Sequence, residues 1–387
     1  MGFHSGFITI VGRPNVGKST LMNALVGEKV AIVSNRPQTT RNRIMGVMTR
    51  PEWQIVFLDT PGIHHPRTKL GESMMQSVKD AMDGMDGLLT LVDVTQVGEQ
   101  DRKIVREMGT RKVPKVLALN KIDLAPKERL LTLMASFADA GYDALIPISA
   151  KTGDGLPDLE AQLVKNLPEG PKYFPDDMMT DQPERQICAE LIREKALLHL
   201  RDEVPHGIGV EMMAMNKESD DFMEIHATIY CERDAHKGII IGRHGAMLQQ
   251  IGTEARADIE ALLGMHVNLK LWVKVRPDWR NRMDDLRTLG YDNKYKKEPV
   301  RLMGKKRGCG APKRRPQPSL FISMTRRLPR CAPQATNKRR GRRSVKLVRR
   351  GLRRGVSDKE RKYRNIGRQV GKERRCLVWQ FYLMWNR

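Results

Sequence analysis

The sequence GRPNVGKS occupies residues 12–19, directly after the apolar run Phe7–Val11 and directly before the helical pattern Gly17–Val26. It fits the pattern GxxxxGK followed by Ser or Thr, a loop whose backbone N–H groups close around phosphate oxygens at the start of a helix. In such a loop Lys18 reaches the β- and γ-phosphates, and the hydroxyl of Ser19 binds Mg²⁺. The chain is therefore expected to contain an α/β domain that binds a nucleoside triphosphate.

Strands and helices alternate through the first half of the chain. Strands separated by helical patterns of about 10–15 residues are typical of βαβ units, and they predict a mostly parallel sheet with helices on both faces. Ligands bind such a sheet at the carboxyl ends of its strands. The predicted strands are Phe7–Val11, Gln54–Leu58, Gly87–Val92, Lys115–Leu119 and Leu145–Ile148, and the predicted helices are Gly17–Val26, Asp101–Thr110 and Glu128–Ala140.

Three further motifs follow the ends of these strands. In DTPG at residues 59–62, Asp59 can hold Mg²⁺ and the N–H of Gly62 can sense the γ-phosphate. In NKID at residues 120–123, the carboxylate of Asp123 can accept hydrogen bonds from guanine N1–H and its 2-amino group, a donor pair that adenine lacks. A site of this kind rejects the wrong base by roughly 10⁴–10⁵-fold, which favours GTP over ATP. SAK at residues 149–151 supplies a backbone N–H for guanine O6.

These motifs define the predicted nucleotide site. Its residues are Gly12, Arg13, Pro14, Asn15, Val16, Gly17, Lys18, Ser19, Thr20, Asp59, Thr60, Pro61, Gly62, Asn120, Lys121, Asp123, Ser149, Ala150 and Lys151. Between the first two motifs, a polar stretch that Pro37 opens contains Thr39 and Thr40. A loop threonine here can close over Mg²⁺ and the γ-phosphate as a switch element. Spacing alone does not decide between the two threonines.

GRPNVGKS, PQTTR, DTPG, NKID and SAK, taken in order, resemble the GTPase domain of the bacterial Era family. The resemblance implies GTP and GDP as ligands, Thr40 as the switch threonine, and Ser19, Thr40 and Asp59 as the Mg²⁺ ligands. It also implies a K⁺ ion that Asn15 supports, and a catalytic set of Lys18, Thr40, Gly62 and Asn15. Ile63 stands where Ras-like enzymes carry a water-orienting glutamine, so slow intrinsic turnover, in or below the range of roughly 10⁻⁴ to 10⁻² s⁻¹, is expected.

The second half follows a stretch rich in Pro and Asp, and we assign residues 168–184 to a linker. The order helix, strand, strand, helix, helix, strand follows, with Gly242-Arg243-His244-Gly245 between the two central helices. This order resembles an α+β KH domain of the second, prokaryotic topology. The predicted elements are Arg185–Leu200, Ile208–Met215, Phe222–Tyr230, the segment Gly238–Ile241, Met247–Leu263 and Val267–Val275.

In a KH domain, the GxxG backbone clamps RNA phosphates and the bases lie in an apolar groove. Three consecutive isoleucines are candidates for the floor of that groove, although some of them are needed for the core. The residues that the resemblance assigns to RNA binding are Lys237, Gly238, Ile239, Ile240, Ile241, Gly242, Arg243, His244 and Gly245.

The distribution of charge separates a C-terminal tail from the rest of the chain. Residues 294–387 hold 32 Lys and Arg residues against four acidic ones, whereas the first 293 residues hold 37 basic and 41 acidic residues. So basic a segment of low complexity cannot bury enough apolar surface to offset its ordering entropy, and we predict disorder there. The tail is either a lineage-specific RNA-binding extension or the product of a shifted reading frame. The predicted domains are a GTPase domain over 1–167, the linker over 168–184, a KH domain over 185–293 and the tail over 294–387.

This pair of domains implies a GTPase that binds single-stranded small-subunit ribosomal RNA near its 3′ end, as a switch in assembly of the small ribosomal subunit. Two other interpretations stay open: a non-enzymatic RNA-binding scaffold, and a peripheral membrane GTPase that the tail and the apolar patch Cys376–Trp385 hold on the anionic inner membrane. The chain contains no run of 18 or more apolar residues, so we predict no transmembrane helix. The five cysteines form no CxxC pair. We expect a cytoplasmic monomer, which under the membrane interpretation touches the cytoplasmic face of the inner membrane.

Overall fold

The structure, a computed structural model, describes residues 2–36 and 38–291, which all lie within one compact unit of the chain. The predicted tail over 294–387, its apolar patch, Pro37 and the last two residues of the predicted KH domain lie outside the described residues. Within the described ranges, no helix is both long and apolar enough to cross a membrane.

All strands and helices predicted for the first half are confirmed, with ends that shift by no more than three residues. Four elements were not predicted: one strand, two α-helices and one short 3₁₀ helix. The strand, β2 (Ile44–Thr49), is buried on both faces and so lacks an alternating pattern. The elements are β1 (His4–Val11), α1 (Lys18–Val26), β2 (Ile44–Thr49), β3 (Trp53–Asp59), α2 (Lys69–Met82), β4 (Gly87–Asp93), α3 (Glu99–Gly109), β5 (Lys115–Asn120), η1 (Ile122–Leu124), α4 (Lys127–Phe137), β6 (Ala144–Pro147) and α5 (Leu156–Lys165).

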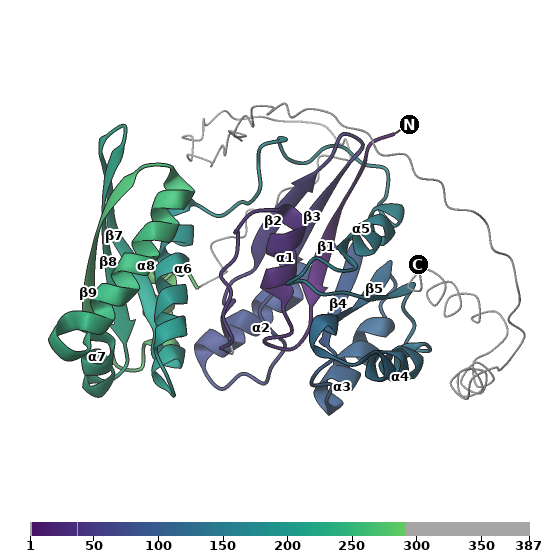
Figure 1. Cartoon of the computed structure of the whole chain (residues 1–387), viewed down its shortest axis with the longest axis horizontal. Coiled ribbons are helices and arrows are strands. Elements are labelled where there is room, and N and C mark those ends of the chain that lie inside the picture. Colours follow the sequence, from purple (N-terminus) through teal and green to yellow (C-terminus); the bar gives the residue numbers. More distant parts are fainter. Residues whose placement is uncertain (1, 37, 292–387) are drawn as a thin grey trace, which may run out of the picture. The chain divides into compact units, whose positions relative to one another are not determined.

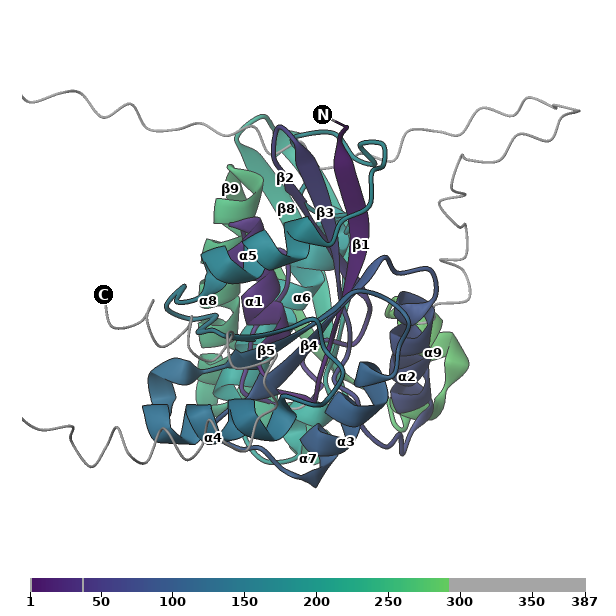
Figure 2. The ribbon, with the colours of Figure 1, turned by 90° about the vertical axis from the view of Figure 1, so that its right-hand side faces the viewer.

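These strands form a six-stranded sheet in the order β2-β3-β1-β4-β5-β6, and only β2 runs antiparallel to its neighbour. Helices cover both faces (Figures 1 and 2). Because successive side chains of a strand point to opposite faces, Ile8 and Ile10 of β1 pack with α1 and α5. Val11 packs with Ile104 of α3 on the opposite face. The predicted class, a mostly parallel sheet between two helical layers, is confirmed.

The second half forms a three-stranded sheet in the order β7-β8-β9, with β8 and β9 parallel. α6, α7 and α8 contribute to one apolar core against this sheet. This is the predicted KH order, and α7 begins four residues before the segment that we predicted. The elements are α6 (Glu184–His199), η2 (Val204–Gly207), β7 (Gly209–Ser219), β8 (Phe222–Cys231), α7 (Asp234–Ile241), η3 (Arg243–Gly245), α8 (Ala246–Leu263), β9 (His266–Val275), η4 (Trp279–Asn281) and α9 (Met283–Thr288).

Much of the predicted linker is fixed to the first sheet rather than free. The buried side chain of Gln54 on β3 accepts hydrogen bonds from the N–H groups of Tyr173 and Phe174, at 2.9 and 3.0 Å, and donates to the carbonyl of Phe174. Farther along, the N–H of Val47 on β2 donates to the carbonyl of Met179 at 2.8 Å. We call residues 168–179 the strap.

Candidate nucleotide site and RNA interface

The phosphate loop is closed by a contact between Gly17 and Asn120. Gly17 has φ 100°, a left-handed conformation that glycine adopts without steric cost, and a Cβ there would lie 2.4 Å from Asn120 Nδ2. Asn120 donates to the carbonyl of Val16 at 2.8 Å and accepts from the N–H of Ala150 at 2.9 Å. One buried amide therefore joins the phosphate loop, the end of β5 and the SAK loop.

Three oxygen-bearing side chains from separate motifs meet behind this loop. Ser19 Oγ donates to Asp59 Oδ2 at 2.6 Å and lies 2.8 Å from Thr40 Oγ1, which is 3.4 Å from the same carboxylate oxygen. Asp59 is fully buried, and its Oδ1 has no hydrogen-bond partner among the described residues. Burial raises the pKa of Asp59, while Lys18 and the hydrogen bonds oppose that rise. Hard oxygen donors around an unsatisfied buried carboxylate fit Mg²⁺.

Lys18 is buried beside this cluster at the start of α1. Its Nζ donates to the carbonyls of Arg13 at 2.9 Å and Gly12 at 3.3 Å. Burial lowers the pKa of Lys18 to about 8, and the charge of Asp59 partly opposes this. An ammonium group held away from water in this way gains strongly from a nearby anion, because burial penalises its charged form.

The switch loop brings Thr40 to the cluster and turns Thr39 away from it. Thr39 Oγ1 donates to the carbonyl of Arg36 at 2.6 Å and lies 2.7 Å from Ser34 Oγ. The geometry therefore separates two threonines that spacing alone could not distinguish.

The predicted base pocket is formed by the loops after β5 and β6. Asp123 is exposed, and its Oδ1 accepts a hydrogen bond from Ser149 Oγ at 2.7 Å. Lys121 Nζ contacts Asp93 Oδ2 at 2.6 Å and donates to the carbonyl of Asn15 at 3.0 Å, which fixes the NKID loop beside the phosphate loop. The Ala150 N–H donates to Asn120 Oδ1 at 2.9 Å, which holds the SAK loop against the end of β5.

Several predicted site residues direct their side chains elsewhere. Arg13 donates to Asp101 Oδ1 and to the carbonyl of Gln96, both at 2.7 Å. Thr60 is fully buried and donates to the carbonyl of Ile10 at 2.7 Å. Both side chains are therefore engaged within the protein, and the backbone of these two residues is the part that faces a nucleotide in the prediction.

The residues around Gly62 pack closely on the phosphate loop. A Cβ at Gly62 would lie 2.4 Å from the backbone nitrogen of Pro14. The N–H of Ile63 donates to the carbonyl of Gly12 at 3.1 Å, and the Ile63 side chain packs with Val11 and Ile104. That side chain is thus part of an apolar cluster under α3.

In the KH domain, the GxxG turn requires glycine at its first position. Gly242 has φ 75° and ψ 177°, and a Cβ there would lie 2.7 Å from Met247 Cβ. Arg243 and His244 are exposed at the turn, and Lys237 is partly exposed on α7. The turn can therefore offer backbone N–H groups and one guanidinium to a phosphate.

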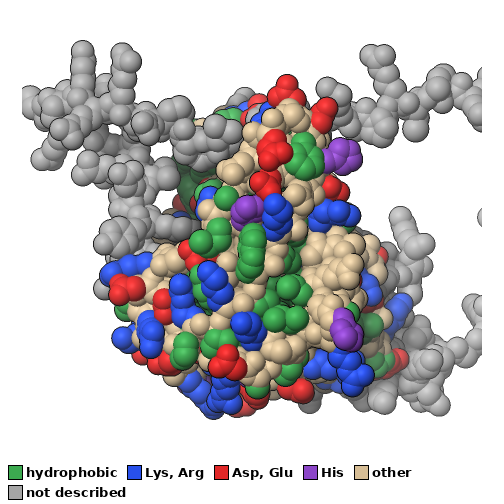
Figure 3. Space-filling model, turned by 90° about the vertical axis from the view of Figure 1, so that its left-hand side faces the viewer, with side chains coloured by type: hydrophobic (Ala, Val, Ile, Leu, Met, Phe, Trp, Pro, Cys, Tyr) green, Lys and Arg blue, Asp and Glu red, His purple; other side chains and the backbone are tan. Residues whose placement is uncertain are grey.

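The three isoleucines of α7 divide between surface and core. Ile239 is 50% exposed, Ile240 is fully buried and Ile241 packs against the core from its edge. The predicted groove floor is therefore corrected for Ile240, whose side chain fills the core because the helix turns it toward the sheet. Figure 3 shows a face of the KH domain on which exposed hydrophobic side chains lie among Lys and Arg.

A set of contacts that the sequence did not predict joins residues 29–36, which lead into the switch loop, to the KH domain. Lys29 Nζ lies 2.6 Å from Glu194 Oε2 and 2.9 Å from Asp258 Oδ2. The N–H of Val33 donates to Glu194 Oε1 at 2.8 Å, and Arg36 Nη2 donates to the carbonyl of Leu200 at 2.9 Å. These pairs lie more than 160 residues apart in the chain, so local patterns could not reveal them.

Comparisons with known proteins agree with this arrangement. The family described as 50S ribosome-binding GTPase matches residues 7–121, and the KH domain family matches residues 203–280. The chain is 51% identical to GTPase Era of Ruminiclostridium cellulolyticum over 293 residues, which are 75% of this chain and 98% of that relative. It is also 51% identical to GTPase Era of Clostridioides difficile over 296 residues, 76% of this chain and the whole of that relative.

Two solved structures are similar over the same extent. One is Era in complex with MgGDPNP and nucleotides 1506–1542 of 16S ribosomal RNA, with a TM-score of 0.72, 40% identity and coverage of 75% of this chain and 99% of that chain. The other is an Era variant from Aquifex aeolicus bound to GDP and AlF₄⁻, with the same TM-score, identity and coverage. The similarity spans almost the full length of these relatives and includes both domains in the same order, and the chain therefore belongs to the GTPase Era family.

Proposed function

We propose that this chain hydrolyses GTP with Mg²⁺, binds small-subunit ribosomal RNA near its 3′ end through the KH domain, and acts as a switch in assembly of the small ribosomal subunit. The observation that carries the proposal is the meeting of Ser19, Thr40 and Asp59 beside Lys18. The complexes that related Era proteins form with MgGDPNP and 16S ribosomal RNA support the ligands. The intact Lys18, Ser19 and Asp59 also argue against a scaffold without enzymatic activity.

In this proposal, each part of the site has a separate task. Ser19, Thr40 and Asp59 would hold the Mg²⁺, which supplies positive charge at the β- and γ-phosphate oxygens. Lys18 binds the same phosphates, and the N–H of Gly62 contacts the γ-phosphate. The apolar Ile63 cannot orient the attacking water by hydrogen bonding, so turnover is slow unless another group or partner assists.

The remaining assignments are also proposals. We retain the domain limits 1–167, 168–184, 185–293 and 294–387, which agree with the end of α5 at Lys165 and the start of α6 at Glu184. We propose that the chain is a monomer in the cytoplasm, the compartment in which ribosomal subunits are assembled. Membrane anchoring by the tail stays a prediction, because the tail lies outside the described residues.

RNA binding and its effect on GTP turnover are tested together on the full chain. We expect single-stranded RNA from the 3′ end of small-subunit ribosomal RNA to raise GTP turnover. Arg243→Glu should lower RNA affinity by roughly tenfold, because it reverses a charge at the phosphate clamp. The affinity is measured by fluorescence anisotropy at about 200 mM salt, where sequence-independent contacts of basic residues contribute less.

Lys217→Glu is the matched control for this experiment, since Lys217 is an exposed lysine of the same domain on β7. It makes the same change in charge away from the turn and should leave RNA affinity within about twofold. Equal losses in both variants would show that net charge, rather than the GxxG turn, determines binding. RNA that binds without any rise in turnover would contradict the proposed switch.

Potassium is expected to support hydrolysis better than sodium. The backbone of Asn15 has φ 63°, and its Nδ2 donates to the carbonyl of Asn35 at 2.8 Å, so the side-chain oxygen can serve as a cation ligand. A cation there would supply positive charge at the position where an arginine finger would otherwise sit. We expect turnover in K⁺ to exceed turnover in Na⁺ several-fold, and Asn15→Ala to remove the difference, in phosphate-release assays at equal ionic strength. Equal rates in both salts would exclude this site.

A further inference from the structure

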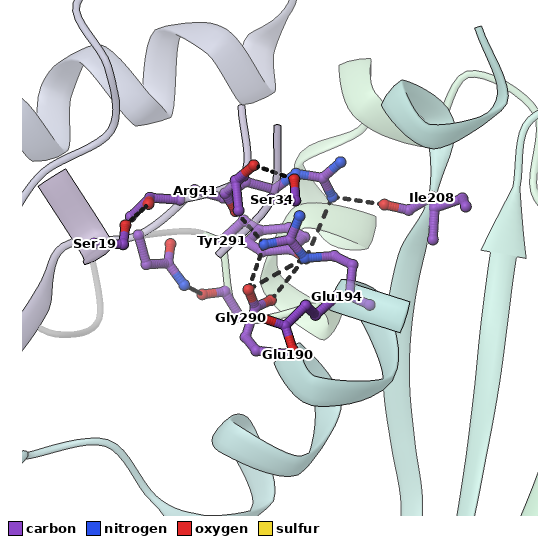
Figure 4. Close-up of polar contacts among 12 residues, drawn as sticks. Ser19, Ser34, Arg41, Glu190, Glu194, Ile208, Gly290 and Tyr291 are labelled. Atoms are coloured by element: carbon purple, nitrogen blue, oxygen red, sulfur yellow. Dashed lines mark hydrogen bonds and ion pairs between the residues drawn. The ribbon is translucent and has the colours of Figure 1, made fainter. Parts of the chain in front are cut away.

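The residues on both sides of Thr40 are held by the KH domain (Figure 4). Before it, the carbonyl of Thr39 accepts a hydrogen bond from Arg193 Nη2 of α6. After it, Arg41 is buried in the KH domain, and Asn42 Nδ2 donates to the carbonyl of Gly290 at 2.9 Å. The side chain of Thr40 points the opposite way, toward Ser19 and Asp59. One short segment therefore spans the distance between the Mg²⁺ ligands and the KH domain.

Arg41 makes the most extensive of these contacts. Its Nη1 donates to the carbonyl of Ile208 at 2.6 Å and to the hydroxyl of Tyr291 at 3.3 Å. Its guanidinium carbon lies 5.5 Å from the ring centre of Trp279 and 5.3 Å from that of Tyr291. The side chain is only 3% exposed. Cation–π contacts of this kind strengthen when they are removed from water.

The same aromatic residues also pack on α2, the helix that follows DTPG. Leu70 and Met74 of α2 belong to one apolar cluster with Trp279 and Tyr291. Ser73 Oγ donates to the carbonyl of Tyr291 at 2.6 Å. Residues 279–291 of the KH domain thus contact both the switch loop at Arg41 and the helix that follows DTPG.

Some buried polar atoms of this interface have no hydrogen-bond partner among the described residues. Two buried guanidinium groups, Arg41 and Arg193, both lie near the carboxylate of Glu190, and Glu194 is a second carboxylate near Arg193. Within the described ranges, Arg41 Nε, Arg193 Nη1 and Asn42 Oδ1 have no hydrogen-bond partner. Unpaired buried polar atoms cost free energy, so the docked and undocked states differ by less than the number of contacts suggests. A ligand that binds one of these two states more tightly shifts the equilibrium between them.

We propose that Arg41 is a positioning residue for GTP hydrolysis. The KH domain holds the Arg41 side chain, and this keeps the neighbouring residue Thr40 at the Mg²⁺ site. The proposal rests on the proposed function and adds the path by which the KH domain influences the nucleotide. Adjacent Cα atoms are about 3.8 Å apart, so Arg41 cannot leave its clamp without moving Thr40. GDP has no γ-phosphate for Thr40 to close over, so GDP binding does not depend on Arg41.

The test compares Arg41→Met, Arg41→Lys and wild type as full chains. For Arg41→Met we expect the affinity for a non-hydrolysable GTP analogue with Mg²⁺ to fall about tenfold, which is typical of coupling between sites. GDP affinity should stay within about twofold, and GTP turnover should fall with the analogue affinity. Arg41→Lys keeps the charge without the planar fork and should recover part of the loss. Equal losses for GDP and the analogue would overturn the proposal.

Lys29→Met is the matched control, because Lys29 joins the same two domains through Glu194 and Asp258 but is 43% exposed. Glu194 is buried, but Lys195 Nζ lies 3.8 Å from Glu194 Oε2 and 2.8 Å from Asp258 Oδ2, so both carboxylates keep a nearby cation in Lys29→Met. Its ratio of analogue to GDP affinity should therefore match that of wild type. If Lys29→Met changes this ratio as much as Arg41→Met does, general docking rather than Arg41 positions Thr40.

Tyr291→Phe supplies a milder variant that keeps the ring and removes only the hydroxyl acceptor. It should lower the same affinity ratio in the same direction, by less than Arg41→Met, with an unchanged melting temperature. No change in the ratio for either variant would overturn the proposal. A wild-type chain that binds the analogue without hydrolysing GTP would instead refute the proposed function, while the ratio would still test Arg41.

Discussion

Replacing Asp123 with Asn should lower the affinity for GTP by about 10⁴-fold and give the chain a preference for xanthosine triphosphate. Asp123 is exposed in the base pocket, where Ser149 Oγ donates to its Oδ1 at 2.7 Å. An asparagine can keep that bond through its own oxygen and present its amide N–H₂ to the base. The donors of guanine, its N1–H and 2-amino group, then face another donor. Xanthine instead has a carbonyl oxygen at position 2, which can accept from the asparagine N–H₂.

The measurement is equilibrium binding of GTP and xanthosine triphosphate to wild type and variant. Hydrolysis of the new substrate should proceed at the wild-type rate, because Lys18, Ser19 and Thr40 are untouched. Asp158→Asn, which changes an exposed acid on α5, serves as the control and should bind GTP normally. GTP affinity that survives Asp123→Asn would refute the base-pocket assignment.

The second large effect is expected for Lys18→Met, which should lower GTP turnover by about 10³-fold. Methionine fills a similar volume without the charge, so the phosphates lose their buried cation. Folding should not suffer, because burial makes the charged form of Lys18 unfavourable in the free chain, as its lowered pKa of about 8 indicates. We therefore expect a melting temperature at neutral pH that is equal to or higher than that of wild type, together with the loss of turnover.

The pH dependence of binding gives an independent check on Lys18. Phosphate binding requires the protonated amine, and the free chain loses that proton as the pH rises past about 8. Wild-type affinity for GTP should therefore fall by up to about tenfold for each pH unit above 8, and Lys18→Met should be flat over the same range. The titration should end below the pH at which guanine loses its N1 proton. A wild-type affinity that rises with pH would contradict the assignment.

The nucleotide site could be predicted because its chemistry is local to each strand end. The phosphate loop, DTPG, NKID and SAK each follow a recognisable apolar strand, and parallel strands bring their carboxyl ends to one edge. Thr40 could not be separated from Thr39 in this way, since both lie in one polar loop. Their difference depends on Ser34 and Arg36, which hold Thr39, and on the KH contacts that flank Thr40.

The contacts between the domains could not be read from the sequence for a different reason. Arg41 lies in a polar loop of the sequence, and the groups that favour its burial, the aromatic pair of Trp279 and Tyr291 and the carbonyl of Ile208, lie far along the chain. Ile240 and Ile239 are equally apolar, and the direction of α7 against its sheet decides which is core. Tertiary packing determines the burial of both Arg41 and Ile240, and the hydrophobic periodicity of the sequence does not indicate it.

The strap has a consequence for how an RNA-bound KH domain can behave. Because residues up to Met179 are attached to the GTPase domain and α6 begins at Glu184, four residues remain as a joint. Such a joint spans at most about 14 Å when fully extended. An undocked KH domain would therefore stay at a high effective concentration beside the switch loops. Release of RNA and redocking then become a unimolecular step, whose rate does not depend on how dilute the protein is in the cell.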